Sequence, residues 1–317
     1  MAVGADDQGV ARAVVAVSKS ATSKITVCVE GERLSLTNLD KVLYPEAGVT
    51  KGAVLDYYRQ VAPVALVHLK RRPVTFRRFP DGVDGASFYE KHVPRAAPGF
   101  VSSIPVPTRS GELDHYPAID SLPALIWAAN LAVLEFHVPM WRSAADGTPE
   151  PSDLIVFDLD PGAPAGLVEC CIVGLAVRER LVADGYVPLA KTSGSKGIQL
   201  YAKRPVSSRE EDPTRYAKAL ASALASDAGL GVVANMRRDL RKNKVLVDWS
   251  QNSTAKTTVA PYSLRATSRI GVSTPLHWEE IEAVAGGDDP DRLRFGPAQV
   301  LERIARDGDL FAPLAGA

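Results

Sequence analysis

The 317-residue chain has few cysteines, no long apolar run and no net charge. Its three cysteines, Cys28, Cys170 and Cys171, offer neither a disulfide framework nor a C-x-x-C zinc pair, so we expect no structural zinc. No apolar stretch reaches the roughly 20 residues that cross a bilayer, so we expect no membrane partner. The 37 basic residues balance 37 acidic ones, which excludes a global attraction for nucleic acid.

The remaining composition is that of an ordinary globular protein, and 46% hydrophobic residues can form a sizeable core. Residues 1–22 are rich in Ala, Val and Ser, and Asp6 and Asp7 come early without a long apolar block, so we expect a disordered tail and not a signal peptide. Residues 142–151 resemble a linker. They predict an N-terminal module over 23–150 and a second module over 151–317. Because no signal peptide is predicted, we expect a cytoplasmic protein.

Local patterns predict a mixture of strands and helices. In the first module we expect a strand pair over 24–36 with a turn at Gly31, and a helix capped by Thr50 that ends near His68. Strands are expected at 73–78 and from Ser87, then an extended ribbon or surface loop over 91–113. A helix that Ser121 begins and that ends near His137 closes this module.

The second module is predicted to contain four strands and four helices. The strands are expected at 153–162, 186–191, 198–203 and from 244, and the helices at 165–184, 212–227, 278–284 and 297–306. The basic clusters at 70–78 and 237–244 can bind phosphates, although a solvated face is the commoner meaning of any single cluster.

Two carboxylates near the end of the first of these strands are the central chemical feature. In the sequence DLIVFDLDPG, Asp158 and Asp160 are two residues apart and therefore project from the same face. Adjacent acids repel one another unless a divalent cation neutralises them, and Pro161 and Gly162 end the strand, which predicts an accessible sheet edge. The alternative is a strand with a solvated acidic face.

A third acid favours the metal site. Asp248 lies on another short apolar strand, KVLVDWS, sharing a face with Leu246 and Ser250. Together, Asp158, Asp160 and Asp248 supply the oxygen ligands that suit Mg²⁺ or Mn²⁺, and two such ions can serve nucleotidyl transfer.

The loop KTSGSKG, residues 191–197, can bind a triphosphate. It offers hydroxyls, backbone amides and a cation through Ser193, Gly194, Ser195 and Lys196. The spacing is not that of a Walker loop, and without further support a glycine-rich hairpin turn is the default. Further donors lie near Asp248 in the sequence, namely Arg241, Gln251 and Arg265.

Taken together, FDLDPG, TSGSKG, VDWSQN and PYSLRA resemble the motifs of the archaeo-eukaryotic primase superfamily, and most closely the polymerase domain of bacterial DNA ligase D. The resemblance runs from about Leu34 to the C-terminus and includes LDKVLYP, PDGVDG, FYEK and LEFHVPMW. No ligase K-x-D-G or histidine-rich nuclease segment is present, so a polymerase that stands alone is expected.

The resemblance implies a role for each matching residue. Asp158, Asp160 and Asp248 would bind catalytic Mn²⁺ or Mg²⁺, and His137 would lie near the incoming nucleotide. From the residues alone, a helix-end histidine bonded to the backbone is preferred for His137. Ser193 and Lys196 would contact the triphosphate, and Arg241 and Arg265 would contact nucleotide or template.

The resemblance also implies contacts with DNA. Lys41 and Lys51 match positions that hold a 5′-phosphate on the downstream strand of a gap or break. Phe88 and Tyr89 match an aromatic pair that stacks on template bases. The alternative for this pair is a strand with one ring in the core.

One residue departs from the family pattern. The loop of the family typically continues small-x-Lys-Gly-x-His, and here the last position is Gln199. A glutamine can still donate to a phosphate or ribose oxygen but cannot carry a proton, which puts a proton-transfer role in doubt.

We therefore expect an α+β primase-polymerase fold with a central mixed or antiparallel sheet, flanking helices and a packed N-terminal module. The expected activity is template-directed addition of nucleotides, NTP or dNTP, across short gaps or broken DNA ends with a downstream 5′-phosphate. The family implies a preference for ribonucleotides, and a DNA ligase or a Ku-type end-binding protein as partners. We expect a nucleoid-associated location in the cytoplasm. Three alternatives are a primase that starts primers de novo, a non-catalytic DNA-end binder, and, less well fitting, a D-x-D phosphohydrolase.

Overall fold

The acidic residues lie on a six-stranded sheet with the order β13-β14-β10-β12-β11-β18. The computed structural model describes residues 24–108 and 110–315. The strands are β10 (Leu154–Gly162), β11 (Leu189–Thr192), β12 (Ile198–Lys203), β13 (Val232–Val233), β14 (Lys244–Asp248) and β18 (Pro275–Leu276). All neighbouring strands are antiparallel except β13 and β14, so the sheet is mixed.

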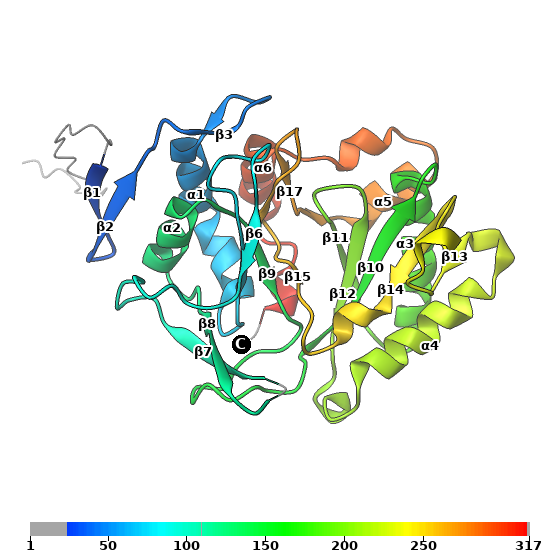
Figure 1. Cartoon of the computed structure of the whole chain (residues 1–317). Coiled ribbons are helices and arrows are strands. Elements are labelled where there is room, and N and C mark those ends of the chain that lie inside the picture. The colour runs from blue at the N-terminus through cyan, green and yellow to red at the C-terminus, as the bar shows by residue number, and fades with distance from the viewer. Residues whose placement is uncertain (1–23, 109, 316–317) are drawn as a thin grey trace, which may run out of the picture.

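Helices cover the face of this sheet that lies opposite the acids. Helices α3 (Leu167–Ala183) and α4 (Pro213–Ala225) both contact β10 (Figure 1). A Cβ on Gly174 of α3 would be 2.8 Å from Ile198 and 3.7 Å from Leu159, so the helix packs directly on β12 and β10. Because Leu159 points toward α3, its neighbours Asp158 and Asp160 project from the other face. The predicted α+β fold with acids on a central mixed sheet is confirmed.

A second sheet belongs mainly to the N-terminal half and has the order β15-β9-β5-β6. Its strands are β5 (Thr75–Arg78), β6 (Phe88–Glu90), β9 (Val133–Val138) and β15 (Thr258–Val259). Helices α1 (Lys51–Leu69) and α2 (Leu122–Asn130) pack against it. Thr50 caps α1 as expected, and its hydroxyl accepts from the Ala53 amide. Since β15 follows β14 in the chain, a segment of the second half completes the sheet of the first.

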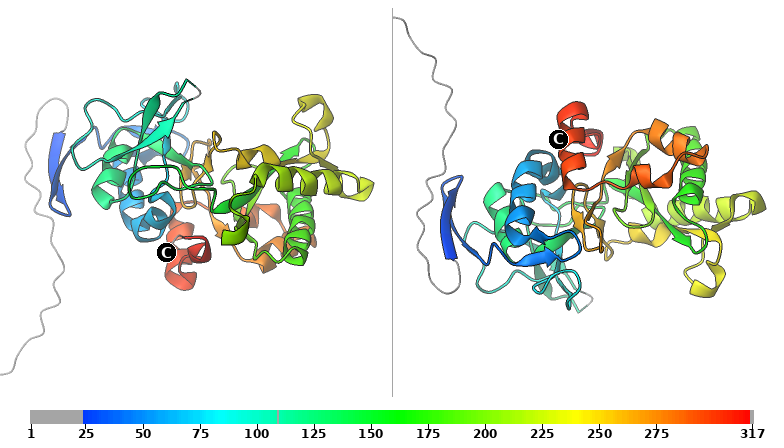
Figure 2. Two further views of the ribbon diagram at one scale, coloured as in Figure 1. Left: turned by 90° about the horizontal axis from the view of Figure 1, so that it is seen from below. Right: turned by 90° about the horizontal axis from the view of Figure 1, so that it is seen from above.

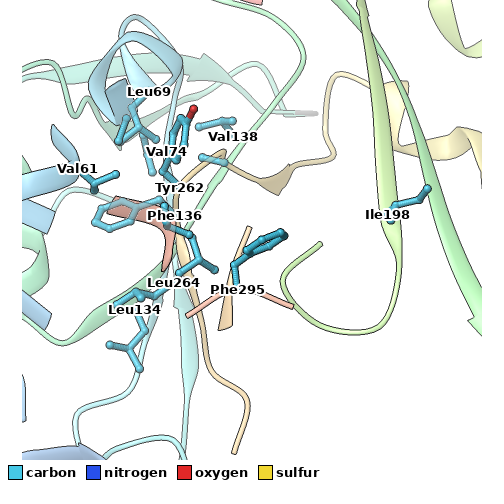
Figure 3. Packing of buried hydrophobic residues seen from close by; sticks show 14 of the residues in the cluster. Val61, Leu69, Val74, Leu134, Phe136, Val138, Ile198, Tyr262, Leu264 and Phe295 are labelled. Atoms are coloured by element: carbon cyan, nitrogen blue, oxygen red, sulfur yellow. The ribbon is translucent and has the colours of Figure 1, made fainter. Parts of the chain in front are cut away.

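The core of this sheet is aliphatic and aromatic. Figure 3 shows Val61, Phe136, Tyr262 and Leu264 close together, with Ile198 of the other sheet some way off. The Tyr58 hydroxyl donates to the Leu134 carbonyl at 2.6 Å, which anchors α1 on β9.

Short hairpins and C-terminal helices complete the fold. The hairpins pair β1 (Lys24–Val29) with β2 (Glu32–Thr37), β3 (Val42–Tyr44) with β4 (Val49–Thr50), β7 (Ser103–Pro107) with β8 (Leu113–Pro117), and β16 (Leu264–Arg265) with β17 (Gly271–Val272). The β1–β2 hairpin lies at one end of the molecule (Figure 2). Helices α5 (Trp278–Ala285) and α6 (Pro297–Asp307) follow, and α6 contacts α1.

One predicted helix is wrong in its second half. The helix that Ser121 begins ends at Asn130, and residues 133–138 form β9 instead. Ala132 between them has a φ of +59°, which a continuing helix does not allow. The sequence VLEFHV is almost entirely buried, so it lacks the alternation of polar and apolar residues that identifies a half-exposed strand.

The position of the acidic strand also differs from expectation. The prediction of an accessible sheet edge is wrong, because β10 lies between β14 and β12 in the middle of the sheet. Asp158 and Asp160 are accessible from the face of the sheet, where both remain partly exposed. The expectation for residues 1–22 lies outside the described residues. In the part of the chain that the structure describes, no helix has the length and apolarity to span a bilayer.

A buried ion cluster joins the two halves. Arg72 donates two hydrogen bonds to Asp153, at 2.9 and 2.8 Å, and Arg142 donates a third at 3.0 Å. Asp153 directly precedes β10, whereas Arg72 precedes β5 of the other sheet. The cluster therefore fixes the start of the acidic strand relative to the N-terminal half.

Candidate active site

The acids belong to a row of polar residues that crosses four adjacent strands. Lys191 of β11 pairs with Gln199 of β12, Gln199 pairs with Asp158 of β10, and Asp158 pairs with Asp248 of β14. Directly paired residues in antiparallel strands place their side chains on the same face, about 4.5–5.5 Å apart at Cβ. Asp160 lies on that face too. The sheet thus brings the three predicted acids to one place.

The negative charges of the three acids repel one another, which favours a bound cation. Burial and the charge of Asp160 raise the pKa of Asp158 to about 7, the hydrogen bond from Gln199 opposes the rise, and Asp248 adds to it. This oxygen-only donor set suits Mg²⁺ or Mn²⁺, and a cation would relieve the repulsion.

The third acid is hydrogen-bonded to the residues that follow it in the chain. Asp248 Oδ1 accepts from the Ser250 hydroxyl at 2.6 Å, and Oδ2 accepts from Gln251 Nε2 at 3.0 Å. As the side chains lie, no three carboxylate, histidine or cysteine groups of residues 24–108 and 110–315 are gathered into one metal site. A cation held by all three acids would have to bind Asp248 beside these hydrogen bonds or in their place.

The loop after β11 lies beside the end of β10. The Ser193 hydroxyl accepts from the amides of Ser195 and Gly197, at 3.3 and 3.2 Å, so it shapes the loop. Gly194 has a φ of +69°, and a Cβ there would be 2.6 Å from Arg265, so only glycine fits. Lys196 is exposed and its Nζ is 3.5 Å from the Pro161 carbonyl. The loop therefore presents a cation next to Asp160, as a triphosphate site requires.

Two arginines border the site in different ways. The Arg241 guanidinium donates to the Met236 carbonyl at 2.5 Å, while its buried Nε has no partner among the described residues. The Arg241 carbonyl packs on Gly162 at the end of β10, where a Cβ would lie 2.0 Å away. Arg265 donates to the Ser193 carbonyl at 2.8 Å, and its Nε is 3.3 Å from Glu135. Arg265 thus connects the loop to the other sheet.

His137 lies on β9 of the other sheet, not at a helix end, so the helix-end alternative is wrong. Its Nε2 is 2.9 Å from Glu135 Oε2. Burial alone would raise the pKa of Glu135, but the hydrogen bond with His137 and the charge of Arg265 bring it to about 2. Burial lowers the pKa of His137, and Glu135 opposes this effect. His137 reaches the loop through Glu135 and Arg265, and no described contact joins it to the acids.

Lys41 and Lys51 form a separate pair at the β3–β4 hairpin. The Lys51 amide donates to the Lys41 carbonyl at 2.8 Å, and Lys41 Nζ is 2.8 Å from Asp81. Lys51 is only 5% exposed, and its Nζ donates to the Thr37 carbonyl at 2.6 Å. Burial, followed by the charge of Lys41, lowers the pKa of Lys51 to about 8. An anion bound by both lysines would counter the repulsion between their charges.

Phe88 and Tyr89 are both exposed, by 46% and 59%, so the alternative with one ring in the core is wrong. Arg78 lies over the Phe88 ring at 5.2 Å and Arg77 over the Tyr89 ring at 5.5 Å. Tyr89 also meets His137 edge to face at 5.8 Å. Tyr89 therefore links His137, which is bonded to Glu135, to the surface of the molecule.

Several buried residues that hydrogen-bond to the site were not predicted from the sequence. Asn252 is buried, and its side chain accepts from the Val156 amide and donates to the Val156 carbonyl, at 2.8 and 2.7 Å. It thereby continues the ladder beside β10 after β14 ends. Lys191 and Tyr201 are buried next to Gln199, and Glu135 next to His137. A charged residue in an otherwise apolar strand was the available signal for Lys191 and Glu135.

Taken together, a mixed sheet with acids on the face opposite its helices and a glycine-rich cationic loop beside them defines a nucleotidyltransferase site. The family model described as "LigD, primase-polymerase domain" matches residues 50–311, and the chain belongs to this family. The predicted resemblance is confirmed. By class the chain is a DNA-directed polymerase.

Individual relatives support the same family assignment. The chain is 45% identical over 290 residues to the multifunctional non-homologous end joining DNA repair protein LigD of Mycobacterium tuberculosis, covering 89% of this chain and 37% of the relative. It is 31% identical over 279 residues to the bifunctional LigD of Bacillus subtilis, covering 87% of this chain and 43% of the relative. The chain thus spans less than half the length of these relatives.

A solved structure gives the same result. The polymerase domain from Mycobacterium tuberculosis ligase D in complex with DNA has a TM-score of 0.82 and 45% sequence identity. The match covers 89% of this chain and 98% of that one.

Proposed function

We propose that this chain fills short gaps and extends broken DNA ends during end joining, adding nucleotides under the direction of a template. The observation that carries the proposal is the pairing of Asp158 with Asp248 across β10 and β14, with Asp160 on the same face and the loop 193–197 beside them. The relatives are named for non-homologous end joining, and the solved domain is a complex with DNA, which supports DNA as the substrate.

In this proposal each part of the site has a task. Asp158, Asp160 and Asp248 would hold Mg²⁺ or Mn²⁺, which would activate the primer 3′-hydroxyl and neutralise the leaving pyrophosphate. Lys196 and the loop amides bind the triphosphate and orient it for in-line attack. The family implies a preference for ribonucleotides, and a ligase or a Ku-type protein acting on the same ends in the cytoplasm.

His137 and Tyr89 are proposed to face the nucleotide and the template. The ion pair of Arg265 with Glu135 and its bond to the Ser193 carbonyl connect the loop 193–197 to the second sheet. Phe88 and Tyr89 offer exposed rings, and stacking on such rings contributes about 1–3 kcal/mol per base.

Lys41 and Lys51 are proposed to bind the downstream 5′-phosphate. The test compares single-nucleotide gap filling on duplexes that differ only in a 5′-phosphate or a 5′-hydroxyl. We expect the wild type to fill the phosphorylated gap faster. The double variant Lys41→Ala, Lys51→Ala should fill the two gaps at equal rates. Lys24→Ala, at an exposed position on β1, is the matched control. Equal rates of the wild type on the two gaps would reject this assignment.

A non-catalytic end binder is the second candidate, because Gln199 replaces the usual histidine. Gln199 Nε2 donates to Asp158 Oδ1 at 3.0 Å, however, so the residue still supports the acid. Activity in primer extension that disappears in Asp158→Ala would favour the polymerase, whereas retained DNA binding with no extension under any condition would favour the end binder.

A further inference from the structure

Gln199 forms a bridge between a buried lysine and the first catalytic acid. Its side-chain oxygen Oε1 accepts from Lys191 Nζ at 2.5 Å and from the Tyr201 hydroxyl at 3.1 Å. Its nitrogen Nε2 donates to Asp158 Oδ1 at 3.0 Å. Lys191, Gln199 and Tyr201 are 0%, 4% and 4% exposed, so water does not compete for these bonds.

The direction of each bond is determined by its neighbours. The Ser273 hydroxyl donates to the Thr192 carbonyl at 3.0 Å, so it can only accept from Lys191 Nζ, 2.6 Å away. Lys191 is therefore a donor on both sides, and this holds for the ammonium and for the neutral amine, which still carries two N–H groups.

The amide of Gln199 then has one favourable orientation. If it were reversed, its NH₂ group would face the N–H groups of Lys191, and its oxygen would face the carboxylate of Asp158. The Tyr201 hydroxyl has one proton and lies within donating distance of both Gln199 Oε1, at 3.1 Å, and the Thr258 hydroxyl, at 2.9 Å. It donates to Gln199 when the Thr258 hydroxyl donates to it. The Lys191 donor on one side and the Asp158 carboxylate on the other thus determine the orientation of the amide.

We propose that Lys191 and Tyr201 are positioning residues, which hold the Gln199 amide so that it directs one oxygen of Asp158 toward itself and leaves the other for the metal ion. A neutral histidine at position 199 would present the same polarity, an acceptor toward Lys191 and a donor toward Asp158. The glutamine keeps this polarity without titrating. This inference rests on the proposed function, since it concerns the same acids.

The test measures the affinity for Mn²⁺ by thermal-shift titration, without nucleotide or DNA. Removing a partner of a metal-bound group typically costs about 10–100-fold in metal affinity. We expect Lys191→Met to weaken Mn²⁺ binding about tenfold and Tyr201→Phe to weaken it less. Lys203→Met, at an exposed position on the same strand as Gln199, is the control and should bind like the wild type.

The double variant Lys191→Met, Gln199→Leu distinguishes positioning of the Gln199 amide from a direct effect of the Lys191 charge on the metal site. If Lys191 acts through the amide, Lys191→Met should have no further effect once Gln199→Leu has removed the bridge. In gap filling, excess Mn²⁺ should restore the kcat of Lys191→Met, because the defect lies in metal affinity.

Two results would overturn the inference. One is equal Mn²⁺ affinity in the wild type and Lys191→Met, and the other is a loss in Lys191→Met that is undiminished in the Gln199→Leu background. If the Mn²⁺ pattern appears as expected but the wild type extends no primer, the positioning role stands and the proposed polymerase function fails.

Discussion

The affinity for a 5′-phosphate should depend on pH through Lys51. With a pKa of about 8, roughly nine-tenths of Lys51 is protonated at pH 7 and about one-tenth at pH 9. A bound phosphate needs the protonated form, so the affinity gained from the phosphate should fall about tenfold over this interval. The phosphate itself adds no step, since its second pKa is about 6.

The assay is competition binding of gapped duplexes with a 5′-phosphate or a 5′-hydroxyl, at constant low salt and without nucleotide. The ratio of the two affinities isolates the phosphate from the rest of the DNA. In Lys51→Arg, whose guanidinium stays charged through pH 9, the ratio should be nearly constant. A wild-type ratio that is the same at pH 7 and pH 9 would refute the assignment of Lys51 to the phosphate.

Two further predictions concern the support of β10. Asp153→Asn should lower the free energy of unfolding by about 3–5 kcal/mol in urea denaturation, because it leaves Arg72 and Arg142 buried without their carboxylate. Gly162→Ala should lower both stability, by about 1–3 kcal/mol, and primer extension, because the new Cβ would lie 2.0 Å from the Arg241 carbonyl and push apart the strand end that carries Asp160.

Each has a matched control. Asp56→Asn removes an exposed ion pair with Arg59 and should change stability by less than about 1 kcal/mol. Gly99→Ala meets nothing within 4 Å and should leave both stability and activity unchanged. Wild-type stability in Asp153→Asn, or full activity in Gly162→Ala, would contradict the role given to these contacts.

Much of the fold is readable from local sequence. The caps at Thr50 and Asp212 locate two helices, and the alternation around Asp158 locates the acidic strand and its face. These features depend on neighbours in the sequence. The error at residues 131–137 arises because β9 is buried on both faces, so that its apolar residues do not alternate and continue the pattern of the preceding helix.

The site required information that local sequence lacks. The shared face of Asp158 and Asp160 follows from their spacing, whereas the pairing of Asp158 with Asp248 and Gln199 depends on which strands are neighbours. For the same reason the central position of β10 could not be predicted. No role was predicted for Lys191, and only the burial of β11 reveals it as a donor to Gln199.

Primer extension on a one-nucleotide gap with a downstream 5′-phosphate tests the central claim most directly. The reactions contain Mn²⁺ or Mg²⁺ and either ribo- or deoxyribonucleotides, and compare the wild type with Asp158→Ala. We predict extension that follows the template, needs the metal ion and is lost in Asp158→Ala. Extension that persists in Asp158→Ala, or no extension by a wild-type protein that still binds the gapped DNA, would contradict the assignment of the acidic row as a polymerase site.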